Sequence, residues 1–191
     1  MRGLTLLSIM LALVLAAPVA AVAQTPAPTG GASYDENAPD PSKPVVEGTK
    51  AVRLDDGRAA APSMAPPEIQ KAIWAANEIV GRPYSYGGGH NRSFKSTGYD
   101  CSGTVSYALH GGGLLKSPLD SGSFMSWGKA HKGTWVTVYA NSTHVIMKIG
   151  DQFYGTSGFG HPESGGGPGW FSVEPSPDYL AGFAVRHPAG L

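Results

Sequence analysis

The residue best suited to covalent chemistry is Cys101, the only cysteine in the chain. It lies in the segment GYDCSGTV, residues 98–105, where we expect a helix to begin at Cys101 or Ser102. A thiol attacks as its thiolate, and the positive end of a helix dipole favours that anion. Unpaired N–H groups at the same helix end can serve as an oxyanion hole. The segment therefore predicts a cysteine nucleophile, and the alternative is a cysteine packed at a helix end without reactivity.

A nucleophilic thiol also needs a base, and histidine is the side chain that most often fills this role. The six histidines of the chain are His90, His110, His131, His144, His161 and His187. Composition and periodicity alone do not choose among them. His144 stands at the start of a predicted strand, and on a sheet packed against the cysteine helix its ring would reach the sulfur.

Two helices and several strands are expected to position these residues. The first helix starts after Pro66-Pro67, which pre-set its first turn, and it ends at Gly81 and Pro83. Apolar residues at positions 69, 73, 76 and 80 follow helical spacing within it. The second helix is the one at Cys101, and the three glycines at 111–113 stop it.

The later half of the domain is typical of strands. We expect them at 135–139, 144–149, 152–154 and 183–186, with a hairpin turn at Gly150-Asp151. Helices followed by consecutive strands predict an α+β domain in which N-terminal helices pack on an antiparallel sheet.

The N-terminal third of the chain has a different composition. Residues 1–23 are typical of a secretory signal peptide, with Arg2, an apolar run and small residues before Gln24. The run is short for a membrane span, which needs about 20 residues. We therefore expect signal cleavage, export to the periplasm, cell wall or medium, and no stable membrane span afterwards. A retained N-terminal anchor is the alternative.

Residues 24–66 are rich in Pro, Ala, Gly, Ser and Asp, which predicts a flexible tether or pro-segment. Residues 67–191 then form one small domain. The formal net charge is zero, which argues against nucleic acid as a partner. No short spacing of ligands suggests zinc, so we expect no metal and no cofactor, and we expect a monomer.

Three blocks of this domain resemble the signature blocks of NlpC-type cell-wall cysteine endopeptidases. They are YSYGG at 84–88, DCSG at 100–103 and HVI at 144–146, in the family's order and with its spacing apart from a few extra residues around 90–95. The resemblance covers roughly residues 69–157. It implies a circularly rearranged papain-like fold and hydrolysis of an amide bond in peptidoglycan stem peptides, usually the bond from D-glutamate, through its γ-carboxyl, to a diamino acid.

By motif position, the resemblance makes Cys101 the nucleophile and His144 the base. Tyr84, Asp100 and Ser102 would line the site, where such residues in the family bind the free amino end of the substrate. No metal is implied.

The chain departs from the family's pattern in two places. The third catalytic position, often a histidine that orients the base, falls on Thr156, with Ser157 and His161 as nearby substitutes. The family's Pro-Gly-Asp turn is replaced by KGTW at 132–135. These departures keep two alternatives open, a wall-binding domain of the same fold with little or no turnover, and an acyl or peptidyl transferase that uses the same Cys-His chemistry.

Overall fold

The computed structural model describes residues 40–156 and 166–191. The predicted signal peptide, residues 24–39 of the predicted tether, Ser157 and His161 lie outside the described residues. Within the described ranges the helices are α1 (Pro67–Ile79), α2 (Cys101–Gly111), α3 (Ser121–Phe124) and α4 (Pro177–Leu180). The strands are β1 (Val45–Val46), β2 (Val52–Arg53), β3 (Ala59–Pro62), β4 (Lys129–Ala130), β5 (Val136–Ala140), β6 (Val145–Ile149), β7 (Gln152–Gly155), β8 (Gly169–Trp170) and β9 (Ala184–His187).

The larger sheet has the strand order β4-β9-β5-β6-β7-β8, and every pairing in it is antiparallel. The four strands expected from the sequence are its central members β5, β6, β7 and β9. The short strands β4 and β8, which carry too few residues for a periodic pattern, complete its two edges. The predicted α+β class with an antiparallel sheet is confirmed.

The β6–β7 hairpin forms where the sequence predicted it. Gly150 and Asp151 both adopt positive φ values, 56° and 76°. This is the backbone of the tight turn that matches the twist of two paired strands, and Gly and Asp tolerate it best. The turn fixes the register, which pairs Ile149 with Gln152 and Met147 with Tyr154.

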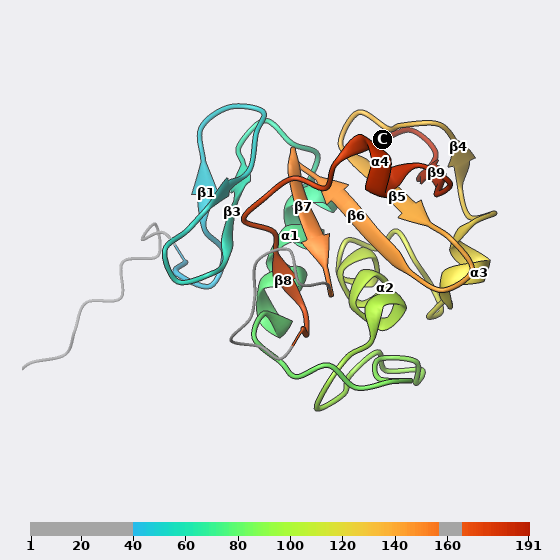
Figure 1. Cartoon of the computed structure of the whole chain (residues 1–191). Coiled ribbons are helices and arrows are strands. Elements are labelled where there is room, and N and C mark those ends of the chain that lie inside the picture. Colours follow the sequence, from blue (N-terminus) through green and yellow to red (C-terminus); the bar gives the residue numbers. More distant parts are fainter. Residues whose placement is uncertain (1–39, 157–165) are drawn as a thin grey trace, which may run out of the picture. The chain divides into compact units, whose positions relative to one another are not determined.

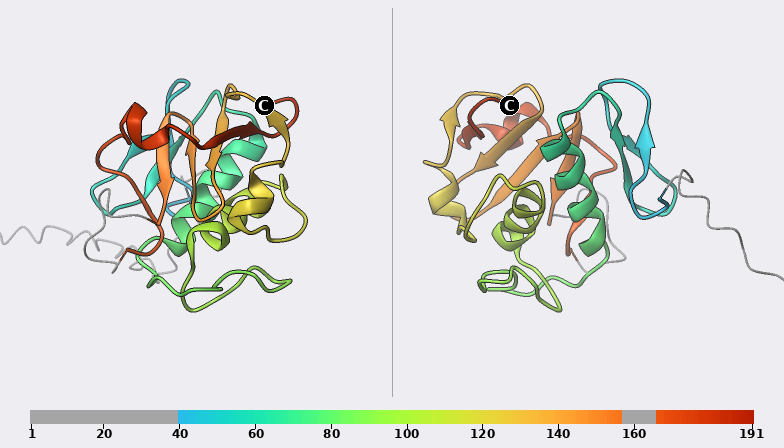
Figure 2. Two further views of the ribbon diagram at one scale, coloured as in Figure 1. Left: turned by 45° about the vertical axis from the view of Figure 1, so that its right-hand side comes forward. Right: turned by 180° about the vertical axis from the view of Figure 1, so that it is seen from behind.

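Helices α1 and α2 pack on each other, and α2 also packs on β6 and β7 (Figures 1 and 2). One face of the sheet is therefore covered by the helices. Val145, Met147 and Ile149, which alternate along β6, are fully buried in the core between these layers, together with Val105 and Leu109 of α2. This packing holds the start of α2 against the sheet, as expected from the sequence.

The opposite face of the sheet carries a second apolar cluster. Tyr139, Ile146, Phe153 and Phe171 are buried there, and Tyr179 of α4 packs partly buried against them. Because β5, β6 and β7 are covered on both faces, β5 is buried at every position. No helix within residues 40–156 and 166–191 is both long and apolar enough to cross a membrane.

Residues 45–62 differ from the flexible tether expected from their composition. They form a second sheet, β1-β3-β2, whose strand β3 is buried against α1. The side chain of Asn77 in α1 accepts from the Ala59 N–H at 2.9 Å and donates to the Ala59 carbonyl at 2.8 Å. Small alanine side chains let the strand approach the helix closely, and this close packing compensates for the lack of bulky apolar residues.

Candidate active site

Helix α2 begins at Cys101 because Asp100 caps it. Asp100 has extended backbone angles, and its Oδ1 accepts the N–H of Gly103 at 2.7 Å. This is the standard geometry of an N-cap, in which a side-chain oxygen satisfies an N–H that the helix leaves unpaired. The first residue of α2 is therefore the cysteine, as predicted.

The glycine-rich loop at 87–89 lies directly against this helix start. A Cβ added to Gly103 would collide with the carbonyl oxygen of Gly88, and one added to Gly89, whose φ is +88°, would come within 2.9 Å of the Gly103 Cα. The segment before the loop is held by a parallel bridge between Tyr84 and Tyr99. The glycines are thus needed so that Tyr84 can lie beside the helix start.

An open cavity of about 520 Å³ is formed at this place. Cys101 and the three predicted substrate-binding residues, Tyr84, Asp100 and Ser102, all line it. The remaining lining residues are Tyr86, Gly87, His90, Asp120, Ser121, Gly122, Ser142 and Thr143. The structure therefore brings together residues that are up to 59 positions apart in the sequence, from Tyr84 to Thr143.

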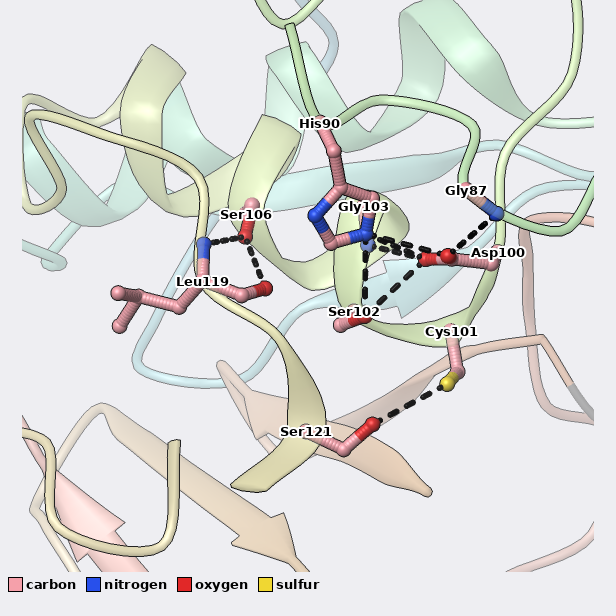
Figure 3. Close-up of polar contacts among 9 residues, drawn as sticks. All are labelled: Gly87, His90, Asp100, Cys101, Ser102, Gly103, Ser106, Leu119 and Ser121. Carbon is pink, nitrogen blue, oxygen red and sulfur yellow. Dashed lines mark hydrogen bonds and ion pairs between the residues drawn. The ribbon is translucent and has the colours of Figure 1, made fainter. Parts of the chain in front are cut away.

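The sulfur of Cys101 points toward Ser121 at the start of α3 (Figure 3). Sγ lies 3.7 Å from the Ser121 hydroxyl, and the Cys101 side chain is largely buried. The N–H groups of Cys101 and Ser102 have no acceptor among the described residues, because the first turn of a helix lacks intrahelical partners. These two N–H groups can stabilise an oxyanion that forms beside the sulfur.

His90, Asp100 and Ser102 meet on the other side of the helix start (Figure 3). His90 Nε2 lies 2.9 Å and 3.1 Å from the two carboxylate oxygens of Asp100, and 3.2 Å from Ser102 Oγ. The Ser102 hydroxyl donates to Asp100 Oδ1 at 3.1 Å.

These three residue types also form hydrolytic triads, but their arrangement here differs. In a triad the serine contacts one ring nitrogen of the histidine and the carboxylate contacts the other. In this chain Asp100 and Ser102 share the single nitrogen Nε2. The ring therefore cannot pass a proton from Ser102 while Asp100 holds its other nitrogen, and Cys101 remains the candidate nucleophile.

Two tyrosines, Tyr84 and Tyr179, have raised pKa values. Burial raises the pKa of Tyr84 above its ordinary value, and the negative charges of Cys101 and Asp100 raise it further. Burial likewise raises the pKa of Tyr179, with a second contribution from Cys101. Both hydroxyl groups therefore keep their protons at neutral pH.

His144 lies next to this region, directly before β6. Its ring packs edge-on against Phe183 at 6.5 Å, and Phe183 lies 5.6 Å from the ring of Tyr179. Burial lowers the pKa of His144 below 6.5, so the imidazole is neutral and able to accept a proton at pH 7. His144 Nε2 is buried without a hydrogen-bond partner in the described part of the chain. The cavity itself is lined by the two preceding residues, Ser142 and Thr143.

Thr156 makes no hydrogen bond to His144 in the described structure, and its role as the orienting residue stays a prediction. Its Oγ1 is buried and has no hydrogen-bond partner among residues 40–156 and 166–191. The physical reason is the strand register. Continuing the β6–β7 pairing past Met147 and Tyr154 places Thr156 opposite Val145, one position away from His144.

No group of three or more His, Cys, Asp or Glu side chains is arranged to hold a metal ion in the described ranges. The prediction of no metal and no cofactor remains a prediction. The contacts of the site are hydrogen bonds, including the one between His90 Nε2 and Asp100 at 2.9 Å.

Three residues of the site were not identified from the sequence as functional: His90, Ser121 and Tyr179. His90 lies among the extra residues that set this chain apart from the family's spacing, which was the available signal. Asp120 caps α3 through the Ser123 N–H at 2.7 Å, and an Asp followed by small polar residues can indicate such a helix start. Nothing in the sequence near Tyr179 indicates its proximity to Cys101.

The chain is similar over part of its length to a solved structure, that of the peptidoglycan hydrolase RipB from Mycobacterium tuberculosis. The two chains are 27% identical, the match covers 63% of this chain and 64% of that chain, and the TM-score is 0.46. This chain therefore matches less than two thirds of that hydrolase. No family model and no curated protein sequence matches the chain.

Proposed function

We propose that the chain is a cysteine hydrolase of the bacterial cell wall, with Cys101 as nucleophile and His144 as base. The observation that carries the proposal is the position of Cys101. Its thiol lies on the first residue of α2, lines an open polar cavity of about 520 Å³, and has the N–H groups of Cys101 and Ser102 beside it. A buried structural cysteine would need neither the cavity nor these open donors.

The proposed reaction has two steps. His144 accepts the thiol proton and the sulfur attacks the carbonyl carbon of a peptide bond, with the oxyanion held by the two N–H groups. The protonated His144 gives its proton to the leaving amine, and an acyl-enzyme remains on Cys101. Water then attacks the thioester, His144 takes the water proton, and the carboxylic acid and the free thiol are released.

His144 suits this role by its ionisation. It is neutral at pH 7 because burial lowers its pKa, and a neutral imidazole can accept the thiol proton. The ring contacts from His144 to Phe183 and from Phe183 to Tyr179 support this assignment. Tyr179 is one of the tyrosines whose pKa is raised by burial and, to a smaller extent, by Cys101.

The proposed substrate is the stem peptide of peptidoglycan, cut at an amide bond between D-glutamate, through its γ-carboxyl, and a diamino acid. The motif blocks at 84–88, 100–103 and 144–146 support this substrate, and Tyr84 and Ser102 line the cavity that would hold it. Such a substrate requires that the chain be exported, which the composition of residues 1–23 favours.

A wall-binding domain with little turnover is the second candidate. One observation favours it, namely that no hydrogen bond from Thr156 or any other described residue fixes His144 Nε2. Loss of the group that orients a catalytic histidine typically lowers the rate by about 10⁴-fold, although it does not abolish catalysis.

Digestion of purified peptidoglycan distinguishes these functions. The full chain, Cys101→Ala, His144→Gln and a control variant, His131→Asn, are incubated with peptidoglycan, and the products are identified by mass spectrometry. His131 is exposed and has a φ of 78°, which asparagine tolerates. We expect new stem-peptide fragments from the full chain and from His131→Asn only. In a parallel incubation, glycine amide is added as an amine acceptor. A transferase would join the acyl group from Cys101 to this amine, and mass spectrometry would detect the resulting amide.

Intact peptidoglycan after incubation with the folded full chain would overturn the hydrolase proposal. Co-sedimentation with peptidoglycan in that case would support the wall-binding function.

A further inference from the structure

Asp100 is already fully engaged within the chain. Its Oδ1 accepts from the Gly103 N–H at 2.7 Å, the Ser102 hydroxyl at 3.1 Å and His90 Nε2 at 2.9 Å. Its Oδ2 accepts from the Gly87 N–H at 2.9 Å and from His90 Nε2 at 3.1 Å. A carboxylate offers about four acceptor positions, so no position on Asp100 is open to a ligand.

His90 makes these contacts as a donor. An ionised carboxylate only accepts hydrogen bonds, and the Ser102 hydroxyl already donates to Asp100. Nε2 of His90 must therefore carry the hydrogen, which it shares between Asp100 and the oxygen of Ser102. A primary ammonium group bound in place of the imidazole would donate to the same two acceptors, the carboxylate of Asp100 and the hydroxyl oxygen of Ser102.

The loop that carries His90 is anchored at Phe94 and Ser96. Phe94 is buried, and its ring stacks on that of His110 in α2 at 3.9 Å. The N–H of Ser96 donates to the Tyr99 hydroxyl at 3.0 Å. His90 is therefore held in place before any ligand arrives, and its side chain is 27% exposed toward the cavity.

The second carboxylate of the cavity is also in use. Asp120 caps α3, with Oδ1 accepting the Ser123 N–H at 2.7 Å and Oδ2 accepting the Ser123 hydroxyl at 3.2 Å. Asp120 keeps further acceptor positions, but it is exposed, and an ion pair with an exposed carboxylate contributes little to affinity.

We infer that His90 determines the specificity of this cavity, because its imidazole occupies the position on Asp100 and Ser102 that a free amino end would need. The substrate class is then a stem peptide whose amino end is acylated, as it is while the peptide remains attached to a glycan strand, rather than a released peptide with a free amino end. The inference rests on the proposed function and reverses what the family resemblance implies for Asp100 and Ser102.

A binding experiment tests this inference separately from catalysis. The Cys101→Ala chain is titrated with two synthetic tripeptides, L-Ala-γ-D-Glu-diaminopimelate with a free amino end and the same peptide N-acetylated. We expect the acetylated peptide to bind at least as tightly as the free one. In the Cys101→Ala/His90→Ala chain the free peptide should gain about tenfold or more relative to the acetylated one, because a charge-assisted hydrogen bond to Asp100 becomes available.

The matched control is His90→Gln, whose side-chain amide N–H can donate to Asp100 as the imidazole does. It should keep the preference of the parent chain. A tenfold preference of the parent for the free peptide, an unchanged preference in His90→Ala, or no binding of either peptide would each overturn the inference. The parent measurement does not depend on whether either His90 variant folds.

Turnover of the same two peptides by the chain with Cys101 intact separates this inference from the proposed function. If both peptides stay uncut while the binding preference changes as expected, the hydrolase proposal fails and the role of His90 stands.

Discussion

Oδ1 of Asp100 accepts the N–H of Gly103 at 2.7 Å, and this hydrogen bond fixes the residue at which the cysteine helix begins. The same carboxylate receives the Gly87 N–H at 2.9 Å and so joins the glycine-rich loop to the helix. Asp100 therefore has a structural role in addition to any role in binding. Its side chain is only 10% exposed, so its loss cannot be compensated by water alone.

Asp100→Ala should lower the free energy of unfolding by about 2 kcal/mol, since it removes an N-cap and a buried hydrogen bond to the loop. Asp100→Asn should cost less, because its Oδ1 can still cap the helix. Urea unfolding followed by circular dichroism measures both. The matched control is Asp120→Ala at the exposed N-cap of the short helix α3, where we expect a loss of about 1 kcal/mol or less. Equal losses at the two positions would contradict the dual role of Asp100.

His144 should titrate below pH 6.5, because burial lowers its pKa. The folded chain then binds this proton more weakly than the unfolded chain, so the stability that depends on neutral His144 is complete above pH 6.5. It is lost as the pH falls from about 6.5 toward the folded-state pKa. Urea unfolding between pH 7.5 and 5.5, with His144→Gln as reference, isolates this contribution. An NMR titration gives the midpoint directly, and a midpoint above 6.5 would show that the ring is not buried as described.

Thr156→Val should raise the free energy of unfolding by about 1 kcal/mol. The hydroxyl of Thr156 is buried without a partner in the described structure, and an isosteric methyl group removes that desolvation cost. Thr137→Val is the matched control, because the Thr137 hydroxyl accepts the Gly133 N–H at 3.2 Å and its loss should destabilise by about 1 kcal/mol. Hydrolysis should change by less than about tenfold in Thr156→Val, whereas loss of an orienting group costs about 10⁴-fold.

Asn77→Ala should destabilise the domain by roughly 3 kcal/mol. The Asn77 side chain makes two hydrogen bonds to Ala59 and accepts the indole N–H of Trp170 at 2.8 Å. It thereby links β3 and β8 to α1. Thermal unfolding gives the stability, and hydrogen exchange at residues 59–62 should become faster.

Lys71→Ala, an exposed substitution on the same helix, serves as the control and should change stability by less than about 0.5 kcal/mol. Unchanged exchange at residues 59–62 in Asn77→Ala would show that β3 does not depend on this side chain.

The sequence determined the elements that local signals encode. The start of α2 at Cys101 follows from an Asp that caps it, the β6–β7 hairpin follows from Gly150-Asp151, and the limits of α1 follow from Pro67 and Gly81. The three predicted binding residues meet at one cavity because they lie within 18 positions of Cys101 in the sequence, around a loop and a helix start.

The tertiary structure decided what depends on distant segments. His90 reaches Asp100 only because its loop folds back on α2, and Ser121 meets the sulfur across 20 positions. Strand β3 is ordered because Asn77 and the close face of α1 stabilise an alanine-rich segment whose composition predicts disorder. The register of β6 and β7 pairs Met147 with Tyr154, and its continuation would set Thr156 opposite Val145. Pairing register and long-range packing are properties of the folded chain, because each depends on residues that composition and local spacing do not connect.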